Sequence, residues 1–129
     1  MGYTSYGANQ VLATLVNNGT QIGLGLSSSE PSEDGTGFVE PTGNGYGRYT
    51  IVMSQNEKDF SDPSNGSVRN RRRLRFPECT GSTWGEIGYV GLFKNNTLVY
   101  YAPVAVPKTV NQDQLCKFNP GAFEITLTT

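Results

Sequence analysis

Short runs of alternating apolar and polar residues constrain the fold of this chain more than any other feature of its sequence. In "TQIGLGL", Ile22, Leu24 and Leu26 fall on one face, and near the end "AFEITLT" aligns Phe123 and Ile125 in the same way. Successive side chains of a β-strand point to opposite faces of a sheet, so a period of two predicts a strand. Further strand-like runs lie at residues 48–54, 71–76, 84–93, 97–106 and 114–118.

One stretch near the start has a different period. In "SYGANQVLATLVNNG", Gly19 stands where a helix favours a left-handed C-terminal residue. The apolar residues at helical spacing before it are Val11, Leu12, Leu15 and Val16. One helix followed by about seven short strands predicts a mainly β fold: an antiparallel β-sandwich or barrel-like domain with one short N-terminal helix.

The length of the chain, 129 residues, fits one hydrophobic core, and neither an internal repeat nor a linker interrupts it. We therefore predict a single β-rich domain over residues 1–129. Residues 56–70 are rich in Asp, Ser, Asn, Gly and Pro, which predicts a long surface loop.

The charges nearly cancel, with 10 basic and 11 acidic residues and a net charge of −1. Such a balance gives no overall field that would draw the chain to nucleic acid or to an anionic membrane, so neither is predicted as a partner. No apolar run is long enough to cross a bilayer and the start lacks the pattern of a secretion signal, which predicts synthesis in a cytoplasm.

The residue types do not favour catalysis or metal binding. Histidine is absent, and Cys79 and Cys116 lie far apart in the sequence, which argues against the usual zinc and CxxC redox sites and leaves open whether the two thiols are bonded. The acidic, glycine-rich residues 27–48 have neither the ligand spacing of a calcium loop nor the lysine of a phosphate loop, and are predicted to form turns between strands. We predict no enzyme activity, no catalytic residue, no metal site and no cofactor.

One basic segment, "RNRRRLRF", is a candidate interaction site. If it is a strand, Arg71, Arg73 and Arg75 share a face opposite Leu74 and Phe76. Several guanidinium groups on one face can bind phosphate. The alternatives are a solvated strand face, or one that pairs with acidic residues of a neighbouring subunit.

Aromatic residues offer a second candidate. Trp84, together with Tyr89, Tyr100 and Tyr101, could form a platform on which a sugar stacks. Aromatic residues in strands also pack in cores and interfaces, so the sequence leaves both interpretations open for Trp84.

Three segments, in this order, resemble a known family: "LSSSEPSEDGTGFVEPTGNGYGRYTI", "LRFPECTGSTWGEIGYVGLF" and "LVYYAPVAVPKTVNQDQLCKFNPGAFEITL". Taken together they resemble small structural proteins of tailed bacteriophages that are described as tail fibre proteins. The shared elements fall on residues 28–35, 40–48, 76–85, 107–110 and 118–122. Glycines in them suit turns, and Trp84 stands where a loop enters a buried strand.

The resemblance implies a non-enzymatic structural component of a tailed-phage virion: a tail fibre, neck or capsid accessory (decoration) protein that assembles through exposed faces and loops. It implies other virion proteins as partners, several copies or a homo-oligomer, synthesis in the cytoplasm of the bacterial host and a final location in the virion. The alternative is a receptor-binding or carbohydrate-binding module at a fibre tip, with a host surface glycan as its ligand.

Overall fold

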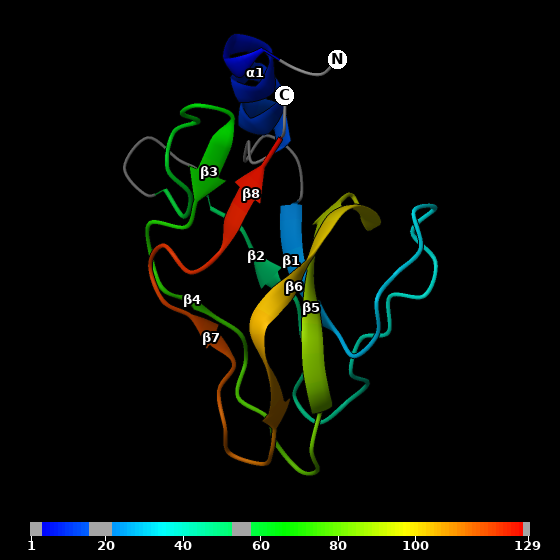
Figure 1. Cartoon of the computed structure of the whole chain (residues 1–129). Helices are drawn as coiled ribbons and strands as arrows, with labels where there is room; N and C mark the ends of the chain where they lie inside the picture. Colours follow the sequence, from blue (N-terminus) through cyan, green and yellow to red (C-terminus); the bar gives the residue numbers. More distant parts are fainter. Residues whose placement is uncertain (1–3, 16–21, 53–57, 128–129) are drawn as a thin grey trace. The chain divides into compact units, whose positions relative to one another are not determined.

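The computed structural model describes residues 4–15, 22–52 and 58–127 of the chain. It confirms a mainly β fold with one N-terminal helix, and the sheets of the described residues do not close into a barrel (Figure 1). The elements in chain order are α1 (Ser5–Leu15), β1 (Ile22–Ser27), β2 (Tyr49–Thr50), β3 (Ser67–Arg69), β4 (Leu74–Arg75), β5 (Gly85–Lys94), β6 (Thr97–Val110), β7 (Lys117–Phe118) and β8 (Glu124–Thr126).

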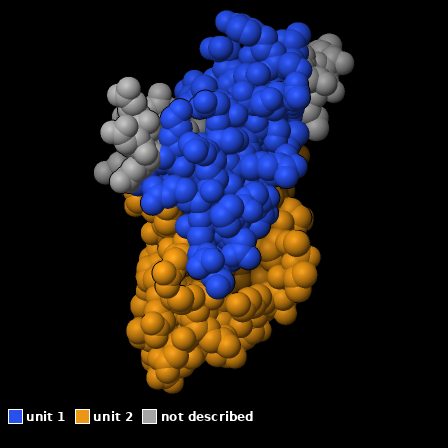
Figure 2. Space-filling view, turned by 90° about the vertical axis from the view of Figure 1, so that its left-hand side faces the viewer, with its two compact units in different colours: residues 1–22, 51–74, 117–129 blue, residues 23–50, 75–116 orange. Residues whose placement is uncertain are grey.

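The chain forms two compact units (Figure 2). Unit 1 comprises residues 1–22, 51–74 and 117–129, and unit 2 comprises residues 23–50 and 75–116. That the chain is one domain over residues 1–129 stays a prediction.

The largest sheet has four strands in the order β2-β1-β5-β6. The three apolar residues of β1, Ile22, Leu24 and Leu26, are at most 2% exposed. This burial confirms the prediction, from the period of two, that the three side chains lie on one face of a strand. β2 pairs with β1 in the antiparallel direction, with Tyr49 opposite Leu24.

β5 and β6 form an antiparallel hairpin whose turn consists of two asparagines. Lys94 lies opposite Thr97, and Asn95 and Asn96 between them have φ angles of 52° and 69°. Asparagine adopts this left-handed conformation more readily than most residues, which is why the pair predicts a tight hairpin. The structure confirms that hairpin.

β6 carries a large bulge in its second half. Ile87 lies opposite Lys108 while Tyr89 lies opposite Pro103, so a single residue of β5, Gly88, faces four residues of β6, 104–107. These four residues include Val106, which is 77% exposed. The sequence predicts the strand, but it gives no sign of this irregularity.

In unit 1, α1 presents Ala8 and Leu12, both 0% exposed, to the protein interior. At its first turn the Thr4 hydroxyl accepts a hydrogen bond of 3.1 Å from the amide of Gly7, as a helix N-cap does. The predicted roles of Val16 and Gly19 lie outside the described residues.

β3 and β8 form a two-stranded antiparallel sheet in unit 1, with Val68 opposite Ile125. Both side chains are at most 1% exposed, and the buried ring of Phe60 packs against Phe123 with ring centroids 6.0 Å apart. The prediction that residues 56–70 form a surface loop is therefore right for residues 61–65 but wrong for residues 59–60 and 66–70, which contain β3 and buried side chains. Two apolar residues, Phe60 and Val68, are sufficient to anchor this polar segment in the core.

Candidate functional site

The acidic, glycine-rich residues 27–48 leave the end of β1 and return to the sheet at β2 without forming a strand of their own. The hydroxyl of Ser27 holds the start of this loop, because it accepts hydrogen bonds from the amides of Ser29 (3.1 Å) and Val39 (2.9 Å). A turn follows in which the amide of Gly35 donates to the carbonyl of Ser32 at 2.9 Å. These contacts agree with the predicted series of turns.

A cluster of three polar side chains, which we call the Glu40 cluster, fastens the same loop to the sheet. Arg48 donates from Nε and Nη2 to the two carboxylate oxygens of Glu40, at 3.1 and 2.8 Å. The hydroxyl of Tyr46 donates to Glu40 at 2.5 Å and accepts from the amide of Leu26 in β1 at 3.0 Å. The Arg48 guanidinium also lies 3.7 Å from the centre of the Phe93 ring.

These contacts set the protonation of the cluster. Burial by itself raises the pKa of Glu40, but the hydrogen bonds from Arg48 and Tyr46 and the charge of Arg48 outweigh it and lower the pKa below 4.5. Burial and the hydrogen bond to Glu40 raise the pKa of Tyr46. Glu40 is thus ionised and Tyr46 neutral at pH 7, an arrangement that holds a loop in place and leaves no free general acid or base.

Glu40→Gln is expected to lower the free energy of unfolding at pH 7 by about 1–2 kcal/mol, because hydrogen bonds to a charged group become bonds to a neutral amide. A carboxyl whose folded pKa is depressed stabilises the fold above its unfolded pKa and loses this effect as the pH falls through the folded value. The difference in the free energy of unfolding between wild type and Glu40→Gln should therefore be largest above pH 4.5 and become smaller below it. Urea unfolding at a series of pH values measures this.

Glu30→Gln, at an exposed position of the same loop, is the control and should change stability little at any pH. A difference between wild type and Glu40→Gln that stayed constant down to pH 3 would contradict the role of the ionised carboxylate.

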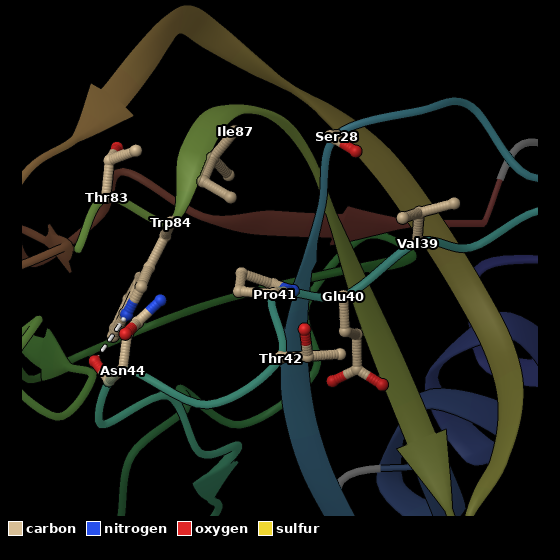
Figure 3. Close-up of a pocket in the computed structure, with 9 residues that line it drawn as sticks. All are labelled: Ser28, Val39, Glu40, Pro41, Thr42, Asn44, Thr83, Trp84 and Ile87. Atoms are coloured by element: carbon tan, nitrogen blue, oxygen red, sulfur yellow. Dashed lines mark hydrogen bonds between the residues drawn. The ribbon is translucent and has the colours of Figure 1, made fainter. Parts of the chain in front are cut away.

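Among the described residues, three hollows within unit 2 border this loop. The first, the Trp84 hollow, has a volume of about 240 Å³ (Figure 3). Its lining residues are Ser28, Val39, Glu40, Pro41, Thr42, Asn44, Thr83, Trp84 and Ile87. Figure 3 shows Trp84 with its indole N–H directed at the carbonyl of Asn44, at a distance of 2.9 Å. With its side chain only 7% exposed and in edge contact with Tyr46, Trp84 is a packing residue in this hollow.

The two other hollows lie beside the start of β6. The Arg48 hollow, of about 360 Å³, is lined by Asp34, Gly35, Phe38, Glu40, Arg48, Phe93, Asn96, Thr97 and Leu98. The Tyr101 hollow, of about 310 Å³, is lined by Ser32, Glu33, Gly35, Leu98, Val99, Tyr100 and Tyr101. Because Gly35 and Leu98 belong to both walls, the two hollows adjoin.

The structure places the predicted interaction residues differently. Arg73 and Arg75 are exposed and alternate with Leu74 and Phe76, which are 0% and 2% exposed, so the predicted alternation is confirmed for residues 73–76. Arg71 is exposed as well, but so is Arg72 beside it, and β4 covers only Leu74–Arg75, so the alternation does not extend to residues 71 and 72. Whether these arginines and Trp84 bind a partner stays a prediction. Glu40 and Arg48 were not predicted as a pair, although both lie in the segment that resembles phage fibre proteins.

The described residues offer little reactive chemistry elsewhere. Cys79 and Cys116 are buried free thiols, and burial raises the pKa of Cys116 to about 11, which keeps that thiol protonated. Within residues 4–15, 22–52 and 58–127, no group of three or more His, Cys, Asp or Glu side chains could hold a metal ion. Over the same residues, no helix is both long and apolar enough to span a membrane.

The comparison with protein families gives one match over almost the whole chain. The model of the family described as podophage GP4 fiber I protein gp80 matches residues 2–126. This match confirms the resemblance to phage fibre proteins. No curated protein matches the chain.

Proposed function

We propose that this chain, which belongs to the family of the podophage GP4 fiber I protein gp80, is a non-enzymatic fibre subunit that binds other virion proteins through its exposed arginines. Membership of a phage fibre family makes it a structural protein of the virus particle and implies contact with other virion proteins. The family also favours a fibre over the neck or the capsid shell as its location.

The observation that carries the proposal is the exposure of Arg71, Arg73 and Arg75, which we call the arginine row. The salt bridges found among the described residues involve Arg48, Lys58, Arg69 and Arg72. Arg71, Arg73 and Arg75 take part in none of these bridges. Exposed guanidinium groups outside the ion pairs of the described residues are suited to bidentate contacts with carboxylates of another protein.

Strand pairing is a less suitable way for this chain to assemble. β6 lies at the edge of the four-stranded sheet, where an open backbone could recruit another strand. Two features oppose this: Pro103 and Pro107 lack amide donors, and the bulge at residues 104–107 distorts the edge. Assembly through side chains remains, and modest contacts of this kind gain strength when several copies bind together.

Replacing Arg71, Arg73 and Arg75 together by serine should release the protein from particles at lower salt than wild type, because partly exposed ion pairs are screened by salt. The measurement is the amount of this protein per purified particle after washes of rising ionic strength, with the variant produced during infection in place of wild type. Cryo-electron microscopy of the same particles would locate the subunit.

A charge-matched control replaces Lys94, Lys108 and Lys117, which lie in unit 2 or at its boundary, by serine. Equal retention of the arginine variant and wild type at every salt concentration would contradict the proposed contact. Equal loss of the arginine variant and the lysine variant would also contradict it, because the loss would then follow from the change in net charge.

A further inference from the structure

The Arg48 hollow and the Tyr101 hollow, which share Gly35 and Leu98, together form one depression, which we call the loop groove. It runs between residues 32–35 and the first residues of β6, and its two parts have volumes of about 360 and 310 Å³. Figure 1 shows this loop, in cyan, as a long excursion beside the β5–β6 hairpin. Each part reaches the size at which small-molecule sites begin, roughly 300 Å³.

One wall of the loop groove presents a fixed donor. Arg48 uses Nε and Nη2 for Glu40 and Nη1 for the side-chain oxygen of Asn96, at 3.2 Å. A guanidinium has five N–H donors, so two remain after these three hydrogen bonds. Stacking on Phe93 at 3.7 Å holds the group flat, with the side chain 32% exposed, so the two remaining donors are held in a fixed orientation.

The loop side of the loop groove, residues 32–35, contributes an acceptor. One carboxylate oxygen of Asp34, Oδ1, accepts hydrogen bonds from the amide and the hydroxyl of Thr36, at 3.0 and 2.7 Å. These bonds orient the side chain and use one oxygen only, so the carboxylate keeps accepting capacity. Donor and acceptor groups that line the same hollow match a ligand rich in hydroxyl groups.

The remaining surface of the loop groove is aromatic and aliphatic. Tyr100 and Tyr101 are half-buried, and the neighbouring Val99 is 43% exposed. Flat aromatic surface beside polar groups suits a ring that carries C–H bonds on one face and hydroxyls on its rim.

The charged side chains that line the loop groove favour a neutral ligand over an acidic one. The positive charge of Arg48 is paired with Glu40, whereas Glu33 and Asp34 add negative charge without a basic partner in the walls of the loop groove. A phosphate, sulfate or uronate group would be repelled there. We propose that the loop groove binds a neutral oligosaccharide, with Arg48 and Asp34 bonded to sugar hydroxyls and Tyr101 packed against a sugar ring.

The loop groove shares no residue with the arginine row, so the two proposals can fail independently. The test measures binding of the full chain to an array that carries neutral oligosaccharides beside uronate-bearing and phosphate-bearing ones, at low and high salt. We expect binding to neutral members that changes little with salt, and binding to acidic members that is about tenfold weaker or more. Tyr101→Ala should weaken neutral binding about tenfold, the effect of one lost aromatic contact.

A pair of matched variants locates the site. Thr97 is exposed on the wall of the loop groove, and Thr109 is exposed on the same strand away from it. Thr97→Trp should fill the loop groove and abolish binding, while Thr109→Trp should leave it within about twofold, with melting temperatures confirming that both fold. No binding to any neutral member, stronger binding to acidic members, or equal effects of the two tryptophan variants would overturn the proposal.

Discussion

Asn70→Ala is expected to lower the free energy of unfolding by about 3 kcal/mol, because it removes a buried side chain that satisfies backbone groups of three residues. Asn70 is 2% exposed. Its amide nitrogen donates to the carbonyls of Arg72 and Asn119, both at 2.9 Å, and its side-chain oxygen accepts from the amide of Phe123 at 2.8 Å. Alanine would leave that buried amide without its acceptor beside the aromatic contact of Phe60 and Phe123.

The measurement is chemical denaturation followed by circular dichroism, with Asn119→Ala as the control. Asn119 is exposed and contributes its carbonyl rather than its side chain, so the same truncation there should change stability by less than about 0.5 kcal/mol. Equal stabilities of the two variants would contradict the role of the Asn70 side chain.

A second variant, Asn70→Asp, separates the donor from the acceptor. At neutral pH a carboxylate oxygen would replace the amide nitrogen and face the carbonyl oxygens of Arg72 and Asn119. Protonation restores one O–H donor, so the deficit relative to wild type should become smaller as the pH falls. A deficit that is independent of pH would show that the two donated bonds contribute little.

Asn70 also shows why part of the fold escapes prediction from the sequence. Alternation predicts β1, and longer apolar runs predict β5 and β6, because each run contains several apolar positions. β3 contains one buried apolar residue, Val68, and its partner strand lies more than fifty residues further along the chain. A polar residue such as Asn70 is buried by tertiary hydrogen bonds, which local composition does not reveal.

The candidate site, like the fold, could be predicted only in part from the sequence. The glycines, prolines and asparagines of residues 27–48 predict turns, and the structure has turns there. The pairing of Glu40 with Arg48 depends on how the loop folds back over β1, and the loop groove depends on the hairpin beside it. No spacing rule links an acidic and a basic residue across an irregular loop, so these contacts required the structure.

Gly45→Ala is expected to destabilise the protein by about 2–4 kcal/mol, through backbone strain and a steric clash together. Gly45 has a φ of 83°, and a Cβ atom there would lie 2.7 Å from the carbonyl oxygen of Glu78 and 2.8 Å from the hydroxyl of Thr80. Backbone oxygen cannot move aside as the end of a flexible side chain can. The adjacent carbonyl of Asn44 accepts hydrogen bonds from Thr80 and from Trp84, so a shift of this turn would break both.

Gly43→Ala separates the two causes, since Gly43 has a φ of 68° but an added Cβ would meet no atom within 4 Å. Gly43→Ala should lower the free energy of unfolding by the backbone strain alone, about 1 kcal/mol. Trp84 is the single tryptophan, so its fluorescence reports the turn directly: Gly45→Ala should shift the emission to longer wavelength as the bond to Asn44 is lost, and Gly43→Ala should not. Equal melting temperatures and equal spectra for the two variants would show that the approach of Gly45 to Glu78 is not a constraint, and that residues 43–46 can be repositioned without disturbing Trp84.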